Sequence, residues 1–181
     1  MPRLFIAIRL PDFIKEDLVR LRDERMRAAS WLPPEQLHLT LKFIGDWPVD
    51  QISEIEEALE TIKTDAFLLE AQGVGRFPGK GRPRVLWTGL GTAHPRLFQI
   101  KHRIENDLLR LGVEPDPRVY QPHITLARCT GATSEDVAPF LKQQRDYTSP
   151  PFRVTGFSLM ESTLTSRGPL HEERTAFALE T

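Results

Sequence analysis

The sequence has very little of several features that define large protein classes. Cys129 is the only cysteine among 181 residues, so no internal disulfide can form, which is typical of proteins from reducing compartments. No apolar run approaches the ~20 residues that a membrane helix requires. The first residues also lack the long apolar core and the cleavage site of a signal peptide. We therefore expect a cytoplasmic protein without membrane association.

An excess of charge of either sign is also absent. Twenty-four Lys and Arg balance 25 Asp and Glu, so the formal net charge is −1. Bulk charge therefore cannot hold long nucleic acid, and a polyanion would have to bind a local basic patch. The sequence contains no P-loop, no G-x-G-x-x-G and no G-x-S-x-G motif. Nucleoside triphosphate chemistry and serine hydrolase chemistry are therefore not indicated.

The apolar fraction of 40% is enough for a packed core, and hydrophobic periodicity predicts both helices and strands. Alternation predicts strands over residues 3–9, 37–44, 67–74, 84–90, 120–127, 152–160 and 174–179. Helical spacing predicts helices over residues 12–26, 50–62, 97–111 and 134–142. The segment 76–83 (RFPGKGRP) is rich in Gly, Pro and positive charge and is predicted to be a loop, and residues 31–34 a turn or extended linker. The fold class is therefore expected to be α+β.

A strand, a helix and a second strand occur twice in this order. RLFIAIRL precedes a helix and HLTL, and RVLWTGLG precedes a helix and HITL, with a period of about 85 residues. This internal duplication predicts a single two-lobed domain over residues 1–181. We expect one lobe to comprise about 1–75 plus the C-terminal strands and the other about 83–160, related by a pseudo-two-fold axis.

The two copies each contain a His-x-Thr strand, His38-Leu39-Thr40-Leu41 and His123-Ile124-Thr125-Leu126. In a strand, residues i and i+2 point to the same face, so each strand presents an imidazole beside a hydroxyl and buries its apolar residues. A single copy would be ordinary surface decoration. Two copies at the same place in a repeated unit indicate a shared groove.

Two histidines and two hydroxyls suit phosphodiester chemistry without a metal. A neutral imidazole can take a proton from water while an imidazolium gives one to the leaving oxygen. Hydroxyls can bind the non-bridging phosphate oxygens. The facing ring nitrogens should then lie about 5–7 Å apart, given hydrogen-bond reach on each side. Zinc would need three or four ligands, and neither strand has a second His or an acid, so we expect no metal and no cofactor.

Five segments together resemble a known family: RLFIAIRLP, LHLTLKFIG, FPGKGRPRVLWTGL, QPHITLAR and FSLMESTLTSRGP. They are similar to the 2H phosphoesterase superfamily and, within it, to the RNA 2′,3′-cyclic phosphodiesterases, also called 2′-5′ RNA ligases. The resemblance implies a bilobal, duplicated α+β fold, with two antiparallel sheets lining a central cleft and helices on the outer faces. It also implies metal-independent hydrolysis of a 2′,3′-cyclic phosphate to a 2′-phosphomonoester.

The same resemblance implies a role for each motif residue. His38 would be the proton donor to the departing 3′-oxygen, and His123 the acceptor that activates water. Thr40 and Thr125 would hold the phosphate oxygens. Arg128 would border the same cleft, although simple alternation turns it away from His123, so a strand end or a bulge is needed to bring it back.

Other polar and aromatic residues have both a binding and a structural interpretation. Arg82 and Arg84, in a cluster with Arg76 and Lys80, could bind RNA phosphates or form a solvated loop. Phe43 and Phe77 could stack a base or belong to the core. Trp87 is expected in the core and His94, His102 and His171 at the surface. After Gly168-Pro169 the resemblance leads us to expect an aromatic residue, where Leu170-His171 stands instead, which affects the substrate contacts of that loop.

Several functions remain open at this point. The expected partners are RNA ends or nucleoside cyclic phosphates, with tRNA halves as one candidate, and the composition is compatible with a monomer. The same two rings could run the reaction in either direction, so the protein could also be a 2′-5′ RNA ligase acting on tRNA halves. A non-catalytic module that binds RNA ends is a third interpretation, which the presence of both histidines and both threonines disfavours.

Overall fold

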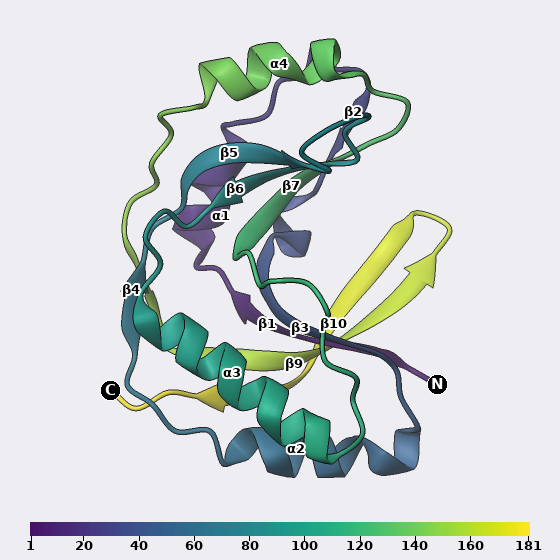
Figure 1. The fold of residues 1–181 in the computed structure, drawn as a ribbon, viewed down its shortest axis with the longest axis vertical. Coiled ribbons are helices and arrows are strands. Elements are labelled where there is room, and N and C mark those ends of the chain that lie inside the picture. Colours follow the sequence, from purple (N-terminus) through teal and green to yellow (C-terminus); the bar gives the residue numbers. More distant parts are fainter.

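The computed structural model describes residues 1–181, which form four α-helices and ten strands (Figure 1). The helices are α1 (Asp12–Val19), α2 (Ile52–Glu60), α3 (Pro95–Arg110) and α4 (Ser134–Gln143), with short 3₁₀ turns η1 (Pro34–Gln36) and η2 (Val49–Gln51). The strands are β1 (Arg3–Arg9), β2 (Ala29–Trp31), β3 (His38–Asp46), β4 (Phe67–Leu69), β5 (Gln72–Phe77), β6 (Val85–Gly89), β7 (His123–Cys129), β8 (Phe152–Val154), β9 (Gly156–Thr165) and β10 (Gly168–Ala178). None of the helices combines the length and the apolar character needed to cross a membrane.

The main sheet consists of two half-sheets that meet at the two His-x-Thr strands. Its strand order is β10-β9-β1-β3-β7-β6-β5, with β2 paired to β7, and all these pairs are antiparallel. Strands β3 and β7 share a single register pair, Leu39 with Ile124. The predicted α+β fold with antiparallel sheets is therefore confirmed. We propose that the half-sheets β10-β9-β1-β3 and β7-β6-β5 form the cores of the two lobes, whose predicted boundaries stay a prediction.

The helices lie on the outside, and two of them, α1 and α3, cross from one half to the other (Figure 1). The upper half of Figure 1 contains the half-sheet β7-β6-β5, and the lower half contains β10-β9-β1-β3. Helix α3 follows β6 of the upper half but packs against α2 and β3 of the lower half. Helix α1 follows β1 of the lower half but lies beside the upper half, where Asp17 accepts a hydrogen bond of 2.7 Å from the Tyr147 hydroxyl. This exchange of helices ties the two halves together.

One continuous core extends through both halves. It contains 36 buried residues, including Leu39 and Leu41 of β3 and Ile124 and Leu126 of β7. Helix α3 contributes residues at helical spacing, Leu97, Ile100, Ile104 and Leu108. On the opposite face of the lower half-sheet, Phe5, Ala7 and Met160 form a small separate cluster. The lower half-sheet is therefore apolar on both faces, and its second face is the one that carries the His38 ring.

The predicted helix over residues 12–26 is too long, because α1 ends at Val19. The Asp23 carboxylate accepts hydrogen bonds from the backbone and the side chain of Arg25, which stabilises a turn in place of a further helical turn.

Three further predicted boundaries are also wrong. The predicted strand 67–74 is divided into β4 and β5, because the backbone of Ala71 bonds the hydroxyl and the amide of Ser149 between them. Arg76 and Phe77, predicted to lie in a loop, belong to β5, where Phe77 pairs with Val85. The segment predicted as a linker at residues 31–34 begins inside the short strand β2, since Trp31 pairs with Ala127.

Candidate active site

The two His-x-Thr strands have the same pattern of burial and the same irregularity. In β3, Leu39 and Leu41 are buried while His38 and Thr40 are partly exposed, and Lys42 is buried as well. Two buried residues in succession break the alternation, and the pairing of β1 with β3 accordingly skips Leu41. A β-bulge of this kind shifts all following residues to the other face.

Strand β7 repeats this arrangement. Its pairing with β6 skips Leu126, so Leu126 and Ala127 are both buried and Arg128 is exposed. The bulge turns Arg128 to the face of His123, which is the condition for this residue to border the cleft. Phe43 occupies the equivalent place in β3, five residues after His38, and 66% of its surface is exposed.

The shared register pair defines how the four motif residues face one another. Leu39 lies opposite Ile124 in an antiparallel pair. If this register is continued by one residue in each direction, His38 comes opposite Thr125 and Thr40 opposite His123. The two histidines are then diagonal neighbours, and the Cα atoms of diagonal positions in an antiparallel pair lie about 7–8 Å apart. A single phosphate bound between them is therefore within reach of both rings.

Both histidine rings are oriented by the same backbone contact. The Nδ1 of His38 lies 2.7 Å from the carbonyl oxygen of Gln36, and the Nδ1 of His123 lies 2.8 Å from that of Gln121. A carbonyl oxygen only accepts hydrogen bonds, so each Nδ1 carries the proton and donates it. Each Nε2 is then free to accept a proton when the ring is neutral and to donate one when it is charged.

Aromatic side chains from the neighbouring strands pack against both rings. The His38 ring lies 5.1 Å from the Phe5 ring, centroid to centroid, and Phe5 in turn lies 6.2 Å from Phe43. The His123 ring lies 4.8 Å from Phe77 and 6.2 Å from Trp87. Trp87, expected in the core, is only half-buried and belongs to the surroundings of His123.

The surroundings of His38 perturb its titration. Burial lowers the pKa of His38 to about 4, against the raising effect of the Gln36 carbonyl. Charges on His171, Arg128 and His123 lower this pKa further, which places all three side chains near the His38 ring. In the absence of a bound anion, His38 is therefore neutral at neutral pH.

His171 was expected at the surface, and this prediction is wrong. Its ring lies 5.4 Å from that of His38 and 5.0 Å from that of Phe5. It reaches the site because β10 begins at Gly168, six residues before the predicted strand, and because Gln36 donates a 2.9 Å hydrogen bond to the Pro169 carbonyl. No local pattern around residue 171 indicated this long-range contact.

The sequence analysis also missed Gln36 and Gln121, although the sequence contained a signal for them. Gln36 and Gln121 both stand two residues before a motif histidine, so the repeated pattern is Q-x-H-x-T-L. Their carbonyl groups fix the tautomers of His38 and His123, and the Gln36 side chain also holds the β9–β10 hairpin.

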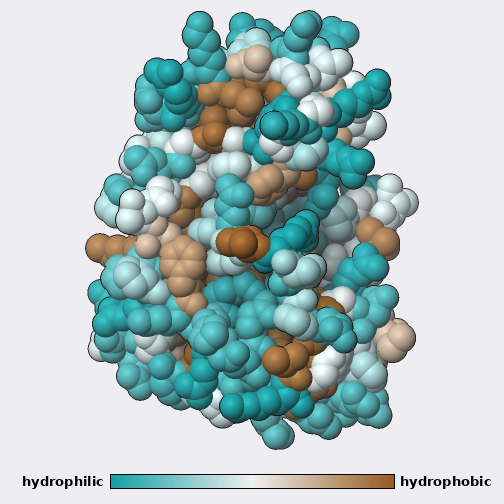
Figure 2. All heavy atoms as spheres, in the orientation of Figure 1, coloured by the Kyte–Doolittle hydropathy of each residue, from teal (hydrophilic) through white to brown (hydrophobic).

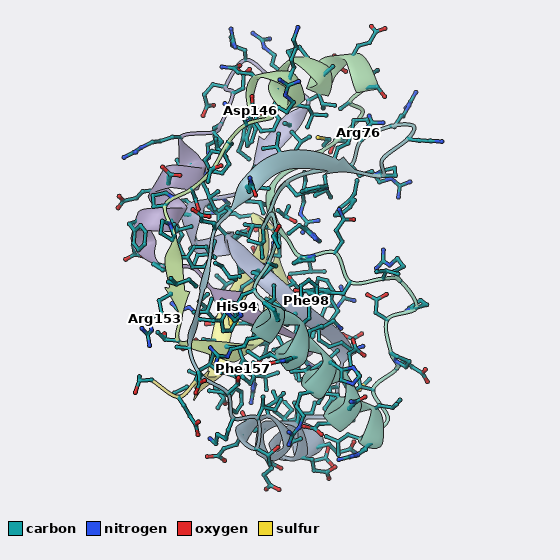
Figure 3. The ribbon with its side chains drawn as sticks, turned by 60° about the vertical axis from the view of Figure 1, so that its left-hand side comes forward. Arg76, His94, Phe98, Asp146, Arg153 and Phe157 are labelled. Carbon is teal, nitrogen blue, oxygen red and sulfur yellow. The ribbon has the colours of Figure 1, made fainter.

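The predicted basic residues differ in their freedom to bind a ligand. Arg82 and Arg84 are exposed in the connection between β5 and β6. The guanidinium of Arg76 is already engaged by the protein, because it donates hydrogen bonds of 2.8 Å to the Ser134 hydroxyl and 3.0 Å to the Gly79 carbonyl. Figure 3 shows Arg76 on the upper half, well separated from the predicted surface residue His94 beside α3. In the space-filling view the surface is hollowed between the two halves (Figure 2).

No group of three or more His, Cys, Asp or Glu side chains is arranged to hold a metal ion. Cys129 is half-buried at the end of β7, and burial raises the pKa of its thiol. Such a thiol is largely protonated and is a weak nucleophile at neutral pH.

Comparison with known proteins decides the family. The family model for LigT-like phosphoesterases matches residues 8–87 and 90–171, two segments that each contain one His-x-Thr strand. The RNA 2′,3′-cyclic phosphodiesterase of Aeropyrum pernix is 33% identical over 86% of this chain and 90% of its own length. The chain belongs to the LigT-like phosphoesterase family. The family predicted from the sequence is therefore confirmed.

Solved structures of related proteins have the same fold. The protein TT0787 of Thermus thermophilus superposes with a TM-score of 0.82 at 26% identity and covers 97% of both chains. LigT of E. coli, solved in complex with 3′-AMP, superposes with a TM-score of 0.83 at 24% identity over the full length of both chains.

Proposed function

We propose that this LigT-like phosphoesterase hydrolyses RNA ends that carry a 2′,3′-cyclic phosphate and produces 2′-phosphomonoesters. The observation that supports it best is the pair of His-x-Thr strands, joined at Leu39 and Ile124 with each histidine fixed by a backbone carbonyl. The name of the Aeropyrum pernix relative and the 3′-AMP bound by E. coli LigT agree with this substrate class.

In the proposed reaction, the oxygen of a water molecule attacks phosphorus and the bond between phosphorus and the 3′-oxygen breaks. Nε2 of His123 takes the proton of the attacking water, and Nε2–H of His38 gives a proton to the departing 3′-oxygen. Each of these proton transfers contributes about 10²–10⁴ to the rate. Thr40, Thr125 and Arg128 bind the non-bridging oxygens, where negative charge accumulates in the transition state.

Protonation of His38 then depends on substrate binding. Its pKa of about 4 means that the free protein holds little of the charged donor at neutral pH. A phosphodiester anion between the rings favours the charged form of His38 and so raises its pKa. The active state has one proton shared between His38 and His123, and activity should show a bell-shaped dependence on pH whose limbs belong to the pair.

Residues around the pair would extend recognition to the rest of the RNA. We propose that exposed Phe43 and the ring of Phe77 stack bases, since every base offers an aromatic face. Arg82 and Arg84 would bind phosphates further along the chain, and this contribution should weaken with salt. We further propose that the protein acts as a monomer in the cytoplasm, where the single thiol of Cys129 stays reduced.

Ligation is a second use of the same site. If the 5′-hydroxyl of another RNA takes the place of water, His123 accepts its proton, His38 protonates the departing 3′-oxygen, and a 2′-5′ bond joins the two RNAs. By microscopic reversibility the two histidines exchange roles when this bond is broken again. We propose this second activity for tRNA halves. High concentrations of both RNA ends and a low product concentration would favour it by mass action.

The test uses a short RNA with a 2′,3′-cyclic phosphate end, incubated with the purified protein and excess EDTA. We expect a 2′-phosphate product, resolved from the 3′-phosphate by chromatography and mass spectrometry. His38→Ala and His123→Ala should each lower kcat at least about 100-fold, whereas His102→Ala, at an exposed position of α3, should be as active as the unchanged protein. A 3′-phosphate product, or full activity in His38→Ala, would refute the proposal.

A further inference from the structure

A third imidazole stands in the site, and the reaction proposed above does not use it. The ring of His171 meets the ring of His38 at 5.4 Å with an interplanar angle of 89°, an edge-to-face contact. It also meets Phe5 edge-to-face, at 5.0 Å and 72°. The three rings come from β3, β1 and β10, so their mutual positions depend on the sheet and not on a loop.

The contact is held in place from both sides. Gln36 accepts the Nδ1–H of His38 with its carbonyl and donates its side-chain amide to the Pro169 carbonyl, two residues before His171. A single residue therefore ties the proton-donor ring to the hairpin that carries the third ring. The Nδ1 atom of His171 is buried and has no hydrogen-bond partner in the protein.

We propose that His171 is a positioning residue that acts through His38. The edge of its ring fixes the orientation of the His38 ring, and a positive charge on His171 disfavours a positive charge on His38 by repulsion. This inference rests on the function proposed above. It assigns to His171 the setting of the pH range in which the histidine pair holds one proton.

The charged groups around His38 allow this competition. Phe5 of β1 and Gln36 of η1 face the ring without charge. The charges come from β7, where His123 and Arg128 are located, and from β10, where His171 is located. No acidic side chain is among the groups that act on the pKa of His38, so only the Gln36 carbonyl offsets the repulsion between two neighbouring imidazolium rings. Burial and Arg128 also lower the pKa of His171, so the pair takes up its last proton only in acid.

The first experiment follows the five histidine ring signals by NMR between pH 8 and pH 3. His171→Phe keeps a ring of similar shape and removes the charge. Two unit charges 5.4 Å apart alter a titration by about 0.5 pH unit even when screened as in water, and more in a half-buried site. We expect the midpoint of His38 to rise by at least this amount in His171→Phe and in the second variant His171→Gln. His102→Phe, on the exposed face of α3, serves as the matched control and should leave the midpoint in place.

The second experiment separates fixing of the ring from substrate binding. Steady-state rates on a nucleoside 2′,3′-cyclic phosphate are measured from pH 4 to pH 8. His171→Ala should lower kcat about tenfold with little change in KM, because a misplaced donor weakens the transition state and not the bound substrate. His171→Phe should keep most of kcat, and the acidic limb of its profile should move to higher pH together with the His38 midpoint.

Two results would overturn the inference. One is an unchanged His38 midpoint in both His171→Phe and His171→Gln. The other is a raised KM with unchanged kcat in His171→Ala, which would make His171 a direct substrate contact. Because the NMR titration needs no turnover, a protein without cyclic phosphodiesterase activity would refute the proposed function while the coupling of His38 and His171 is still decided by the titration.

Discussion

Acid should destabilise this protein through one partly buried histidine, and the size of the effect can be worked out. In the unfolded chain His38 has an ordinary pKa of 6.5, whereas in the folded protein burial lowers it to about 4. The folded state therefore binds fewer protons, so stability is complete above pH 6.5 and is lost as the pH falls toward 4. The linkage relation gives a loss of about 2 kcal/mol at pH 5 and about 3 kcal/mol at pH 4.

The assay is urea unfolding followed by circular dichroism at pH 7 and pH 5. The unchanged protein and His38→Phe are compared, and the quantity of interest is the change in unfolding free energy between the two pH values. Carboxylates contribute to this change equally in both proteins and cancel, as does the loss of the Gln36 hydrogen bond at both pH values. We expect His38→Phe to lose about 2 kcal/mol less than the unchanged protein.

His102→Phe repeats the comparison with an imidazole that lies exposed on α3 and contacts Asn106. It reports what removal of a histidine does in general, so that the difference belongs to His38. If His38→Phe and the unchanged protein lose the same stability between pH 7 and pH 5, within about 0.5 kcal/mol, burial does not depress the proton affinity of His38. Substrate binding would then not be what loads this proton donor.

Three more substitutions test contacts elsewhere. Gly75→Ala places a methyl carbon against the Trp87 ring, far inside van der Waals contact, so calorimetry should show a loss of about 1–3 kcal/mol; an unchanged melting temperature would contradict this packing. Glu105→Gln removes the carboxylate that pairs at 3.2 Å with the buried Lys42 ammonium, and urea unfolding should show a cost of about 3 kcal/mol or more, partly recovered when Lys42→Met is added. Arg128→Gln should raise KM for a nucleoside 2′,3′-cyclic phosphate about tenfold, and a KM unchanged at low salt would remove Arg128 from the phosphate site.

Local patterns were sufficient for the faces of the motif strands. Alternation predicted β1 over residues 3–9, which are its observed bounds, and it placed His38 beside Thr40 and His123 beside Thr125. These predictions succeed because the motif residues precede the bulges, and in a regular stretch of strand the side-chain direction follows the parity of the residue number.

Features that depend on a partner strand could not be read in the same way. The bulges at Leu41 and Leu126 arise where the pairing strand skips a residue, and only they bring Phe43 and Arg128 to the cleft face. The position of His171 depends on the hairpin that pairs β10 with β9 and on the Gln36 contact more than 130 residues away. Neither leaves a periodic signal in the surrounding sequence, although the repeated glutamine two residues before each histidine was visible.

The departures from symmetry explain how a duplicated site can perform an asymmetric reaction. The hydrolysis proposed here requires one charged and one neutral imidazole, and two identical environments would give neither ring a preference. The strands around His38 and His123 are alike in pattern and bulge, but their neighbours differ. His38 is packed by Phe5 and His171, and its pKa is depressed, so in the proposed reaction it is charged at neutral pH only when an anion bound beside it raises this pKa. In the proposed reaction, a donor that gains its proton on substrate binding loses this proton readily to the departing 3′-oxygen, as the donor side of the reaction needs.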